Sequence, residues 1–332
     1  MNERKLRVAV VGLGKMGLLH TSILNVLPTV ELVALCEKSS LIRRFFTKVF
    51  RKVPILEDAE KLSNFKLDAV YVTTPIPSHF GVVRAVYVNK IAENVFVEKP
   101  LAASYDEARE LCNLAERCSG VSMVGYLRRF YATFRKAKDL LENGAIGELS
   151  SFKAYAFSSD YLGVKDIQDS SVRKGVLGDL GCYAMDLAFW FFGDLVLKSV
   201  NVKSLFQDST VGEVVRFELG HKGGFSGVCD VSWRMRNYRM PEVGFSIEGS
   251  KGSLEVNDDK VDLRLKNGES AEWYRHDLND NVSFWLGAPE YFREDDYFVQ
   301  CVLKGCEAEP CFVSASKVDK LIDEVKRELS GD

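Results

Sequence analysis

Residues 6–17 read Leu6-Arg7-Val8-Ala9-Val10-Val11-Gly12-Leu13-Gly14-Lys15-Met16-Gly17, an apolar run that passes into three glycines spaced as G-x-G-x-x-G. Glycines recur by chance, but here a predicted strand precedes them, a predicted helix follows, and Glu37 stands twenty positions beyond Gly17. The first glycine permits a tight turn, the second a close approach of the backbone to a pyrophosphate, and the third close packing of helix on strand. The stretch therefore predicts a dinucleotide-binding βαβ unit with the phosphates at the helix N-terminus.

Short apolar segments alternate with helical patterns over the first 125 residues, which predicts parallel βαβ units. The strands are rich in Val and almost continuously apolar, as in sheets covered on both faces. We expect strands at Leu6–Val11, Val30–Cys36, Leu67–Thr73, Val95–Glu98 and Val121–Gly125, and helices at Lys15–Leu27, Ser39–Lys52, Ser78–Lys90 and Ser104–Cys118. The prediction is an N-terminal Rossmann domain, a doubly wound parallel sheet whose ligand lies outside the carboxyl ends of its strands.

The pattern changes after residue 125. Many of the later strand-like segments alternate apolar with polar residues, which predicts a large, mostly antiparallel open sheet with one face against helices. The expected strands are Glu148–Ser158, Val196–Leu205, Val214–Leu219, Gly224–Trp233, Gly244–Glu248, Gly252–Val256 and Val261–Leu265, and the expected helices are about Tyr131–Asn143, Asp179–Phe192, Arg293–Lys304 and Ser314–Leu329. We predict an α/β protein with a Rossmann domain at 1–125, a C-terminal α+β domain at 126–313 and a last helix within 314–332.

The composition narrows the possible functions. The 332 residues are 46% apolar and 27% charged with a net charge of −3, so nothing favours nucleic acid or an acidic membrane surface as a partner. The apolar runs are too short to span a bilayer, and the first five residues lead directly into a strand, without the features of a signal peptide. We therefore expect a cytoplasmic protein. The eight cysteines form no C-x-x-C pair, so we interpret them as reduced thiols and predict no metal site.

Glu37 is expected to accept hydrogen bonds from the hydroxyls of the adenosine ribose. Its charge would repel a 2′-phosphate, which favours NAD over NADP. NADP stays possible because Lys38, Arg43 and Arg44 follow closely, and such cations could accommodate the phosphate. The other interpretation of this basic stretch is a solvated helix face.

Thr73-Thr74-Pro75-Ile76-Pro77-Ser78-His79 ends a predicted strand at the same edge of the sheet. Its small hydroxyl residues and constrained backbone suit a loop that passes under the cofactor, with His79 approaching it. An ordinary proline-rich turn, in which Ser78 caps a helix, explains the same residues equally well.

Several motifs together resemble the glucose–fructose oxidoreductase/inositol dehydrogenase (Gfo/Idh/MocA) family. They occur in order along nearly the whole chain: the glycine loop with His20, the Thr74-Pro75 to His79 loop, Glu98-Lys99-Pro100, Gly125-Tyr126-Leu127-Arg128-Arg129-Phe130, Gly178-Asp179-Leu180-Gly181-Cys182-Tyr183-Ala184-Met185-Asp186 and Glu248-Gly249-Ser250-Lys251-Gly252-Ser253-Leu254. The resemblance implies a nicotinamide-dependent oxidoreductase that acts on a sugar, cyclitol, nucleotide sugar or related diol. It also implies a homodimer or homotetramer formed through the C-terminal sheet, and a last helix that packs back on the Rossmann domain.

The resemblance assigns roles to individual residues. Lys99 would sit beside the nicotinamide and polarise the reacting oxygen, and the Lys99–Pro100 bond would be cis. Many members carry Asp-x-x-x-His on the substrate-side helix, whereas this chain has Asp179-x-x-x-Tyr183. Glucose–fructose oxidoreductase and dihydrodiol dehydrogenases also carry tyrosine there, so the tyrosine shifts the chain away from typical inositol dehydrogenases.

We predict that Tyr183 and Lys99 transfer the proton and stabilise the alkoxide. The phenol has a free pKa near ~10, and a nearby ammonium would favour its phenolate form. Asp179, one helical turn earlier, would orient Lys99 or bind a substrate hydroxyl; otherwise its charge complements the helix N-terminus. For Tyr183 the alternative is a half-buried aromatic with its hydroxyl at the surface. Asp186 is expected to be structural.

The predicted cofactor-binding residues are Gly12, Gly14, Lys15, Met16, Gly17, Glu37, Lys38, Thr73, Thr74, Pro75, His79, Glu98 and Lys99. The candidates for substrate contact are Arg128, Tyr161, Arg173 and Arg234. Two other functions stay open. One is a non-catalytic regulator that senses NAD(P) or a sugar, against which the retention of Lys99, Asp179 and a protic side chain at 183 argues. The other is a reductase of a non-sugar substrate such as biliverdin, which a polar Tyr–Asp pair fits less well.

Overall fold

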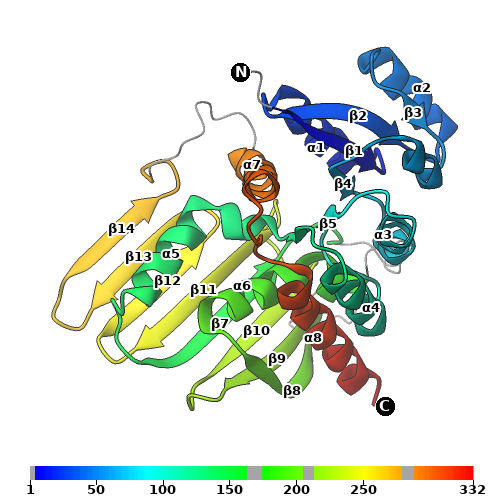
Figure 1. Ribbon diagram of the computed structural model, residues 1–332. Helices are drawn as coiled ribbons and strands as arrows, with labels where there is room; N and C mark the ends of the chain where they lie inside the picture. Colours follow the sequence, from blue (N-terminus) through cyan, green and yellow to red (C-terminus); the bar gives the residue numbers. More distant parts are fainter. Residues whose placement is uncertain (1–3, 163–173, 205–212, 279–287, 332) are drawn as a thin grey trace. The chain divides into compact units, whose positions relative to one another are not determined.

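The computed structural model describes residues 4–162, 174–204, 213–278 and 288–331. The chain divides into two compact units. The first comprises Met1–Tyr126 and Phe284–Asp319, and the second Leu127–Ser283 and Lys320–Asp332. Their described residues hold one sheet each (Figure 1).

The first unit is built on a six-stranded parallel sheet in the order β3-β2-β1-β4-β5-β6. Its strands are β1 (Leu6–Val11), β2 (Val30–Cys36), β3 (Ile55–Leu56), β4 (Ala69–Val72), β5 (Asn94–Glu98) and β6 (Ser122–Gly125). The chain moves outward from β1 to β3 on one side and then from β4 to β6 on the other. A strand order that reverses in this way opens a crevice beyond the carboxyl ends of β1 and β4, where such sheets bind their ligands.

The helices of this unit are α1 (Lys15–Val26), α2 (Ser40–Val49), α3 (His79–Val88), α4 (Tyr105–Glu116) and α7 (Pro289–Lys304), and α8 (Phe312–Ser330) begins in it. Helices α1, α3 and α4 have buried residues that recur at helical spacing, which gives each of them one face that packs within the unit. Every residue of β4 is buried, as are Val8, Ala9 and Val10 of β1. This continuous burial confirms the doubly wound parallel sheet predicted from the apolar strands.

The second unit holds an eight-stranded sheet in the order β14-β13-β12-β11-β7-β10-β9-β8. Its strands are β7 (Leu149–Phe157), β8 (Leu195–Ser204), β9 (Glu213–His221), β10 (Ser226–Ser232), β11 (Glu242–Gly249), β12 (Gly252–Asn257), β13 (Lys260–Leu265) and β14 (Ser270–Tyr274). All neighbours pair antiparallel except β7 and β10, which run parallel. The mostly antiparallel sheet confirms the predicted fold class.

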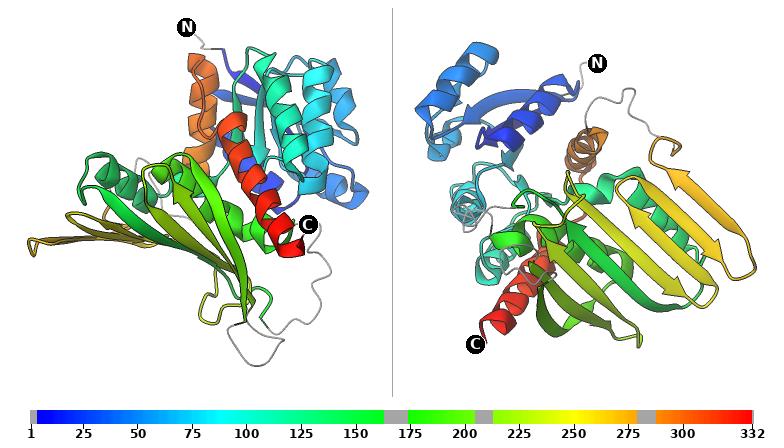
Figure 2. Two further views of the ribbon diagram at one scale, coloured as in Figure 1. Left: turned by 90° about the horizontal axis from the view of Figure 1, so that it is seen from below. Right: turned by 180° about the vertical axis from the view of Figure 1, so that it is seen from behind.

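Two helices of the second unit pack on one face of this sheet. Helix α5 (Ala132–Glu142) contacts β12 and β13, whereas α6 (Cys182–Phe192) contacts β7, β8 and β11. Within the described residues of this unit, the opposite face carries no helix (Figure 2). An open sheet face is compatible with the predicted oligomer. The oligomer itself, the domain boundaries at 125 and 313 and the docking of the last helix stay predictions.

Three kinds of local structure were missed by sequence reasoning. Strand β3 has only two residues, too few to show a periodicity. Strand β14 lies at the sheet edge with alternate residues exposed, and its few apolar side chains hide it in a polar stretch. The expected helix at Asp179–Phe192 begins instead as a π-helix, Leu177–Gly181, before α6.

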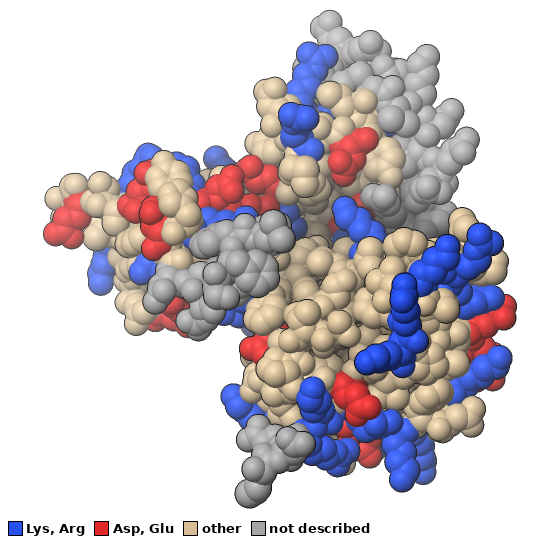
Figure 3. All heavy atoms as spheres, turned by 90° about the horizontal axis from the view of Figure 1, so that it is seen from above, with Lys and Arg blue, Asp and Glu red and all other residues tan. Residues whose placement is uncertain are grey.

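Positive and negative side chains are mixed on the surface, in line with their nearly equal numbers in the sequence. Basic and acidic side chains lie interspersed over the face in Figure 3, separated by uncharged residues, as expected from 44 Lys and Arg against 47 Asp and Glu. Each helix among the described residues is too short or too polar to cross a bilayer.

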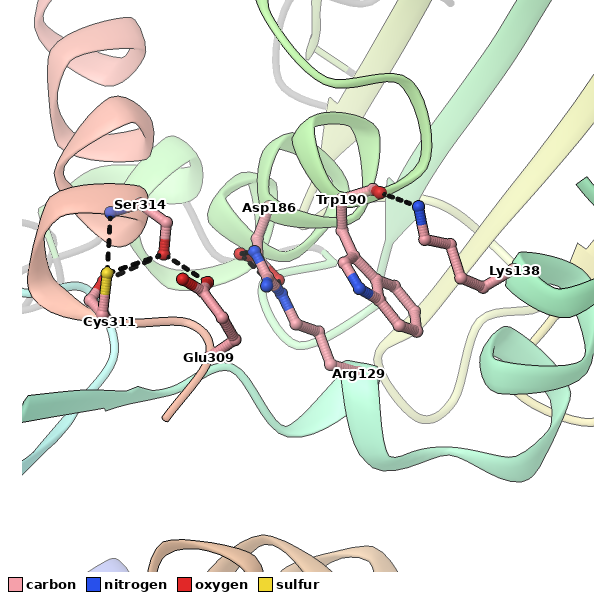
Figure 4. A network of polar contacts seen from close by, with 7 residues as sticks. All are labelled: Arg129, Lys138, Asp186, Trp190, Glu309, Cys311 and Ser314. Carbon is pink, nitrogen blue, oxygen red and sulfur yellow. Dashed lines mark hydrogen bonds and ion pairs between the residues drawn. The ribbon is translucent and has the colours of Figure 1, made fainter. Parts of the chain in front are cut away.

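A buried ion pair anchors α6 within the second unit. The guanidinium of Arg129, in the 3-10 helix Leu127–Phe130, donates to both carboxylate oxygens of Asp186, with Nη2 at 2.6 Å and Nε at 2.9 Å from its two partners (Figure 4). Lys138 of α5 adds a second link by donating its Nζ to the Trp190 carbonyl oxygen at 2.6 Å. Asp186 is 1% exposed, so its charge is matched inside the protein rather than by water. This confirms the structural role expected for Asp186.

Removing the Asp186 carboxylate tests how much α6 depends on this pair. We expect Asp186→Ala to lower the free energy of unfolding by about 3–5 kcal/mol, because the buried guanidinium of Arg129 loses the carboxylate to which it donates two hydrogen bonds. The exposed pair Arg84–Glu110 supplies the control, and Glu110→Ala should cost less than about 1 kcal/mol. Urea unfolding of both variants measures the difference; equal losses would contradict the prediction.

Candidate active site

The glycine loop follows β1 and has no room for side chains at its first and last glycines. Gly12 has φ +93°, and a Cβ there would stand 2.7 Å from the Thr74 backbone nitrogen. A Cβ on Gly17 would stand 1.9 Å from the Gly12 carbonyl oxygen. Gly14 differs, since nothing lies within 4 Å of its would-be Cβ. Gly12 and Gly17 therefore allow helix α1 to lie close against β1, whereas Gly14 faces open space.

That open space lies at the N-terminus of α1. Gly14 is the N-cap residue, the described residues show no side-chain cap on the first turn, and no acidic residue lies in that turn. Lys15 is exposed and Met16 half-buried. First-turn N–H groups and the positive end of the helix dipole favour an anion. The residues present therefore fit the pyrophosphate of a dinucleotide.

Glu37 lies beside the glycine loop at the end of β2. Its carboxylate accepts hydrogen bonds from the backbone nitrogens of Leu13 and Ser39, each at 2.8 Å. Each carboxylate oxygen has a second lone pair that could still accept a ribose hydroxyl. Lys38 is exposed, and its carbonyl oxygen accepts a hydrogen bond from Arg43 Nη1 at 2.6 Å. The side chain of Glu37 thus holds the backbone of the glycine loop through Leu13.

The segment after β4 is joined to the glycine loop. Thr73 Oγ1 donates to the Gly12 carbonyl oxygen at 2.6 Å, and the Thr73 nitrogen donates to Val11 at 2.9 Å. Thr74 Oγ1 is buried and has no hydrogen-bond partner among the described residues. Pro75 is exposed. A buried hydroxyl beside the glycine loop is a polar group that a bound cofactor could satisfy.

His79 is 1% exposed and makes its polar contacts with the backbone. Its Nδ1 lies 3.0 Å from the Pro100 carbonyl oxygen, and its Nε2 lies 2.8 Å from that of Thr74. Burial lowers the pKa of His79, and a neutral ring donates to one of these two carbonyl oxygens. The ring lies between the segment after β4 and the segment after β5. Ser78 makes no side-chain cap on α3, so the alternative of a simple capped turn does not describe this loop.

Glu98, Lys99 and Pro100 follow the carboxyl end of β5. The Lys99–Pro100 bond is cis, as the family resemblance implies. Glu98 is buried, whereas Lys99 is half-buried. Because β1, β4 and β5 are neighbours in a parallel sheet, the segments that follow them share one edge. The first unit thus brings together Gly12–Gly17, Glu37, Thr73–His79 and Glu98–Lys99.

The second unit brings together Asp179, Tyr183 and Arg128. Asp179 lies in the π-helix and Tyr183 in the first turn of α6, and both are half-buried. Single π-turns within helices occur frequently at functional sites. The Arg128 guanidinium lies 4.4 Å from the centroid of the Tyr183 ring, within the range of a cation–π interaction.

Arg128 is held by more than the tyrosine. Its Nε and Nη2 donate to the two carboxylate oxygens of Asp258 at 3.1 and 3.0 Å, and Nη2 also donates to the Pro241 carbonyl oxygen at 3.0 Å. Burial lowers the pKa of Arg128, but the charge of Asp258, followed by Tyr131 and Tyr183, raises it above its usual value. The predicted substrate contact is therefore a fixed cation under Tyr183.

Of the other substrate candidates, Tyr161 contacts Trp233, the residue before Arg234, and Arg173 is not described. The Tyr161 ring lies 4.7 Å from the Trp233 ring, measured between centroids, and the Tyr161 nitrogen donates to the Trp233 carbonyl oxygen. Arg234, next to Trp233, is half-buried. Arg173 lies outside the residues that the structure describes. Their role in substrate contact stays a prediction.

Sequence reasoning missed Asp258 and Asp295. Asp258 stands in the turn between β12 and β13, where acidic residues are common for their turn preference alone. Asp295 is 0% exposed on α7, within the run Glu294-Asp295-Asp296, and such a run usually indicates a solvated helix face. In neither case does the local sequence indicate the partner.

Comparison with known proteins assigns the family. Residues 6–126 match the family model described as "Oxidoreductase family, NAD-binding Rossmann fold", and residues 134–255 match the GFO/IDH/MocA C-terminal domain. The chain belongs to the GFO/IDH/MocA family of oxidoreductases. The family resemblance inferred from the motifs is thereby confirmed.

Individual relatives are more distant. The chain is 24% identical over 267 residues to trans-1,2-dihydrobenzene-1,2-diol dehydrogenase of Xenopus tropicalis, covering 79% of this chain and 78% of that one. It is 25% identical over 287 residues to myo-inositol 2-dehydrogenase of Thermotoga maritima, covering 81% of each. The structure of levoglucosan dehydrogenase in complex with NADH and L-sorbose has a TM-score of 0.86 over 99% of this chain and 98% of that one, at 18% identity.

Substitutions at Gly14 and Gly17 distinguish an effect on folding from an effect on cofactor binding. Gly17→Ala should lower the free energy of unfolding by about 2 kcal/mol or more, because its Cβ overlaps the Gly12 oxygen. Gly14→Ala should leave unfolding within about 1 kcal/mol of wild type, since its Cβ meets open space, yet weaken NADH binding by about tenfold or more, since that space is where the pyrophosphate belongs. Urea unfolding and NADH fluorescence titration measure the two effects. Unchanged NADH affinity in Gly14→Ala would argue against this loop as the phosphate site.

Proposed function

We propose that this oxidoreductase is an NAD-dependent dehydrogenase or reductase that acts on the CH–OH carbon of a sugar, cyclitol, nucleotide sugar or related diol. The observation that carries the proposal is the edge shared by the glycine loop after β1 and Lys99 after β5. Lys99 directly follows β5, and the carboxyl ends of such strands form the edge where dinucleotide sites occur. The named activities of the relatives on an inositol and on a dihydrodiol support the substrate class.

The cofactor choice rests on Glu37. Its carboxylate lies at the carboxyl end of β2, where an acidic residue reads the ribose diol of NAD. Arg43, the nearby cation that could favour NADP, donates Nη1 to the backbone oxygens of Glu37 and Lys38 and pairs with Glu57 through Nη2 at 3.4 Å. These contacts favour NAD because they occupy the Arg43 guanidinium with partners in the protein rather than with a 2′-phosphate.

The nicotinamide ring, when bound, supplies the exchange of hydride, which no side chain of this chain provides. Tyr183 would take the proton from the substrate hydroxyl during oxidation and return it to the carbonyl oxygen during reduction. Arg128 beneath its ring supports this role, because a neighbouring cation favours the deprotonated phenol that a base requires.

Lys99 would stabilise the developing alkoxide through its ammonium group. Asp179, one turn before Tyr183, would bind a neighbouring substrate hydroxyl or orient Lys99. A diol or polyol suits such a set, because it offers a second hydroxyl to a carboxylate while the first reacts.

Lys99→Met tests the first role. Turnover of NAD with a panel of sugars, inositols and diols should be abolished, because the alkoxide loses its cation, while NADH affinity should stay within about twofold of wild type, since the pyrophosphate site is elsewhere. Steady-state kinetics and NADH fluorescence measure the two. Loss of NADH binding would show that Lys99 serves the cofactor instead, and wild-type protein that turns over none of the panel would favour the regulator.

Tyr183→Phe tests the second role. The ring and its contact with Arg128 stay, and only the hydroxyl is lost, so stability should change little. We expect kcat to fall by about a hundredfold or more, the usual contribution of a general acid–base group. The double variant with Lys99→Met should fall by less than the product of the two single effects if both residues act on one oxygen. A near-wild-type rate in Tyr183→Phe would remove the phenol from the mechanism.

A further inference from the structure

Two buried histidines contact the residues on either side of Lys99. His20, on α1, is 0% exposed and places Nε2 3.0 Å from Glu98 Oε1 and Nδ1 2.8 Å from Asp295 Oδ1 on α7. His79, at the start of α3, places Nδ1 3.0 Å from the Pro100 carbonyl oxygen. Glu98 and Pro100, the two neighbours of Lys99, are therefore each held by an imidazole.

The contact through Glu98 reaches Lys99 itself. The second carboxylate oxygen of Glu98 accepts a hydrogen bond from the Lys99 backbone nitrogen at 3.1 Å. One carboxylate thus joins the backbone of Lys99 to the ring of His20, and Asp295 fixes the other side of that ring. The chain of contacts leads from α7 through α1 to the end of β5.

Charge holds this chain of contacts together. Burial lowers the pKa of His20, but the charges and hydrogen bonds of Asp295 and Glu98 outweigh it and raise that pKa well above 6.5. Burial alone would raise the pKa of Glu98, but its hydrogen bond to His20 and the His20 charge lower it below its usual value. An imidazolium between two carboxylates is a charge-assisted network, in which hydrogen bonds are shorter and stronger than between neutral groups.

The second histidine ties Pro100 to the loop after β4. The Nε2 of His79 lies 2.8 Å from the Thr74 carbonyl oxygen, and Thr74 adjoins the residue that binds the Gly12 carbonyl oxygen. Movement of the Lys99–Pro100 segment would therefore break a contact with the neighbouring loop as well as one with α1.

We propose that His20 and His79 are positioning residues that hold Lys99 from its two sides, a role that rests on the function proposed for Lys99 above. A reacting group displaced by about 1 Å can lose about a hundredfold in rate, so fixing its backbone at both ends matters for turnover. Neither histidine needs to touch the substrate.

Substitution of either histidine by asparagine or by glutamine should keep one of its two ring contacts and remove the other. An asparagine amide reaches about as far as Nδ1, and a glutamine amide about as far as Nε2. At position 20, Gln keeps the contact with Glu98 and Asn loses it. At position 79 the order reverses, because Pro100 lies on the Nδ1 side: Asn keeps the contact and Gln loses it.

The experiment measures kcat, NADH affinity and hydrogen exchange of the Lys99 amide in the cofactor-free protein for all four variants. We expect His20→Asn and His79→Gln to lower kcat by about tenfold to a hundredfold. They should also speed exchange of the Lys99 amide by about tenfold, and in both measurements each should have an effect at least about threefold larger than the other variant at its position, His20→Gln or His79→Asn. Thr21→Val, an isosteric change at the neighbouring buried position of α1, is the control and should change neither.

The positioning role is supported if Gln is the milder substitution at position 20 and Asn the milder one at position 79, both in kcat and in exchange of the Lys99 amide. The same order at both positions, with kcat following the loss of stability in urea, would overturn it and leave the histidines as structural residues only. If the wild-type protein turns over no polyol, the proposed function fails by itself, and the exchange of the Lys99 amide still decides whether the histidines hold that backbone.

Discussion

The contact between residues 12 and 17 is the constraint on which the first unit depends. A Cβ at residue 17 would stand 1.9 Å from the Gly12 carbonyl oxygen, so α1 can begin beside β1 only when residue 17 is glycine. The same Gly12 oxygen accepts the hydroxyl of Thr73, which draws the end of β4 to the loop. The N-terminus of α1 without a side-chain cap, the open space over Gly14 and the start of the loop after β4 lie beside this close approach.

The polar interior of the first unit is concentrated behind that edge. His20, Glu98 and Asp295 are buried together, although buried charge is costly unless it is paired. One imidazolium pairs with both carboxylates and connects α1, the end of β5 and α7, while Asp295 Oδ2 is buried without a hydrogen-bond partner among the described residues. Phe96, Tyr71 and Phe298 pack around this network and keep water out of it. The resulting rigidity lies at the end of β5, where Lys99 begins.

In the second unit, two arginines pair with carboxylates. Arg129 pairs with Asp186 inside α6, and Arg128 pairs with Asp258 while its guanidinium lies against Tyr183. Adjacent arginines therefore serve different purposes, one fixing the helix and the other placing a cation under the phenol. A planar guanidinium suits both purposes, since it can bind a carboxylate with two hydrogen bonds and stack on an aromatic ring at once.

The sequence by itself determined the class of fold, the glycine loop and the chemical character of Lys99, Asp179 and Tyr183. These are readable because periodicity and spacing are local: Leu6–Val11 is apolar except for Arg7, and the three glycines stand within six residues. Strand β3, with two residues, and the polar edge strand β14 lacked such a signal. The partners of buried charges were decided only by the tertiary structure. His20 finds Glu98 and Asp295 at separations of 78 and 275 residues, and Arg128 finds Asp258 at 130. A local pattern shows that a side chain is buried, but which group neutralises it depends on how distant strands and helices are packed together.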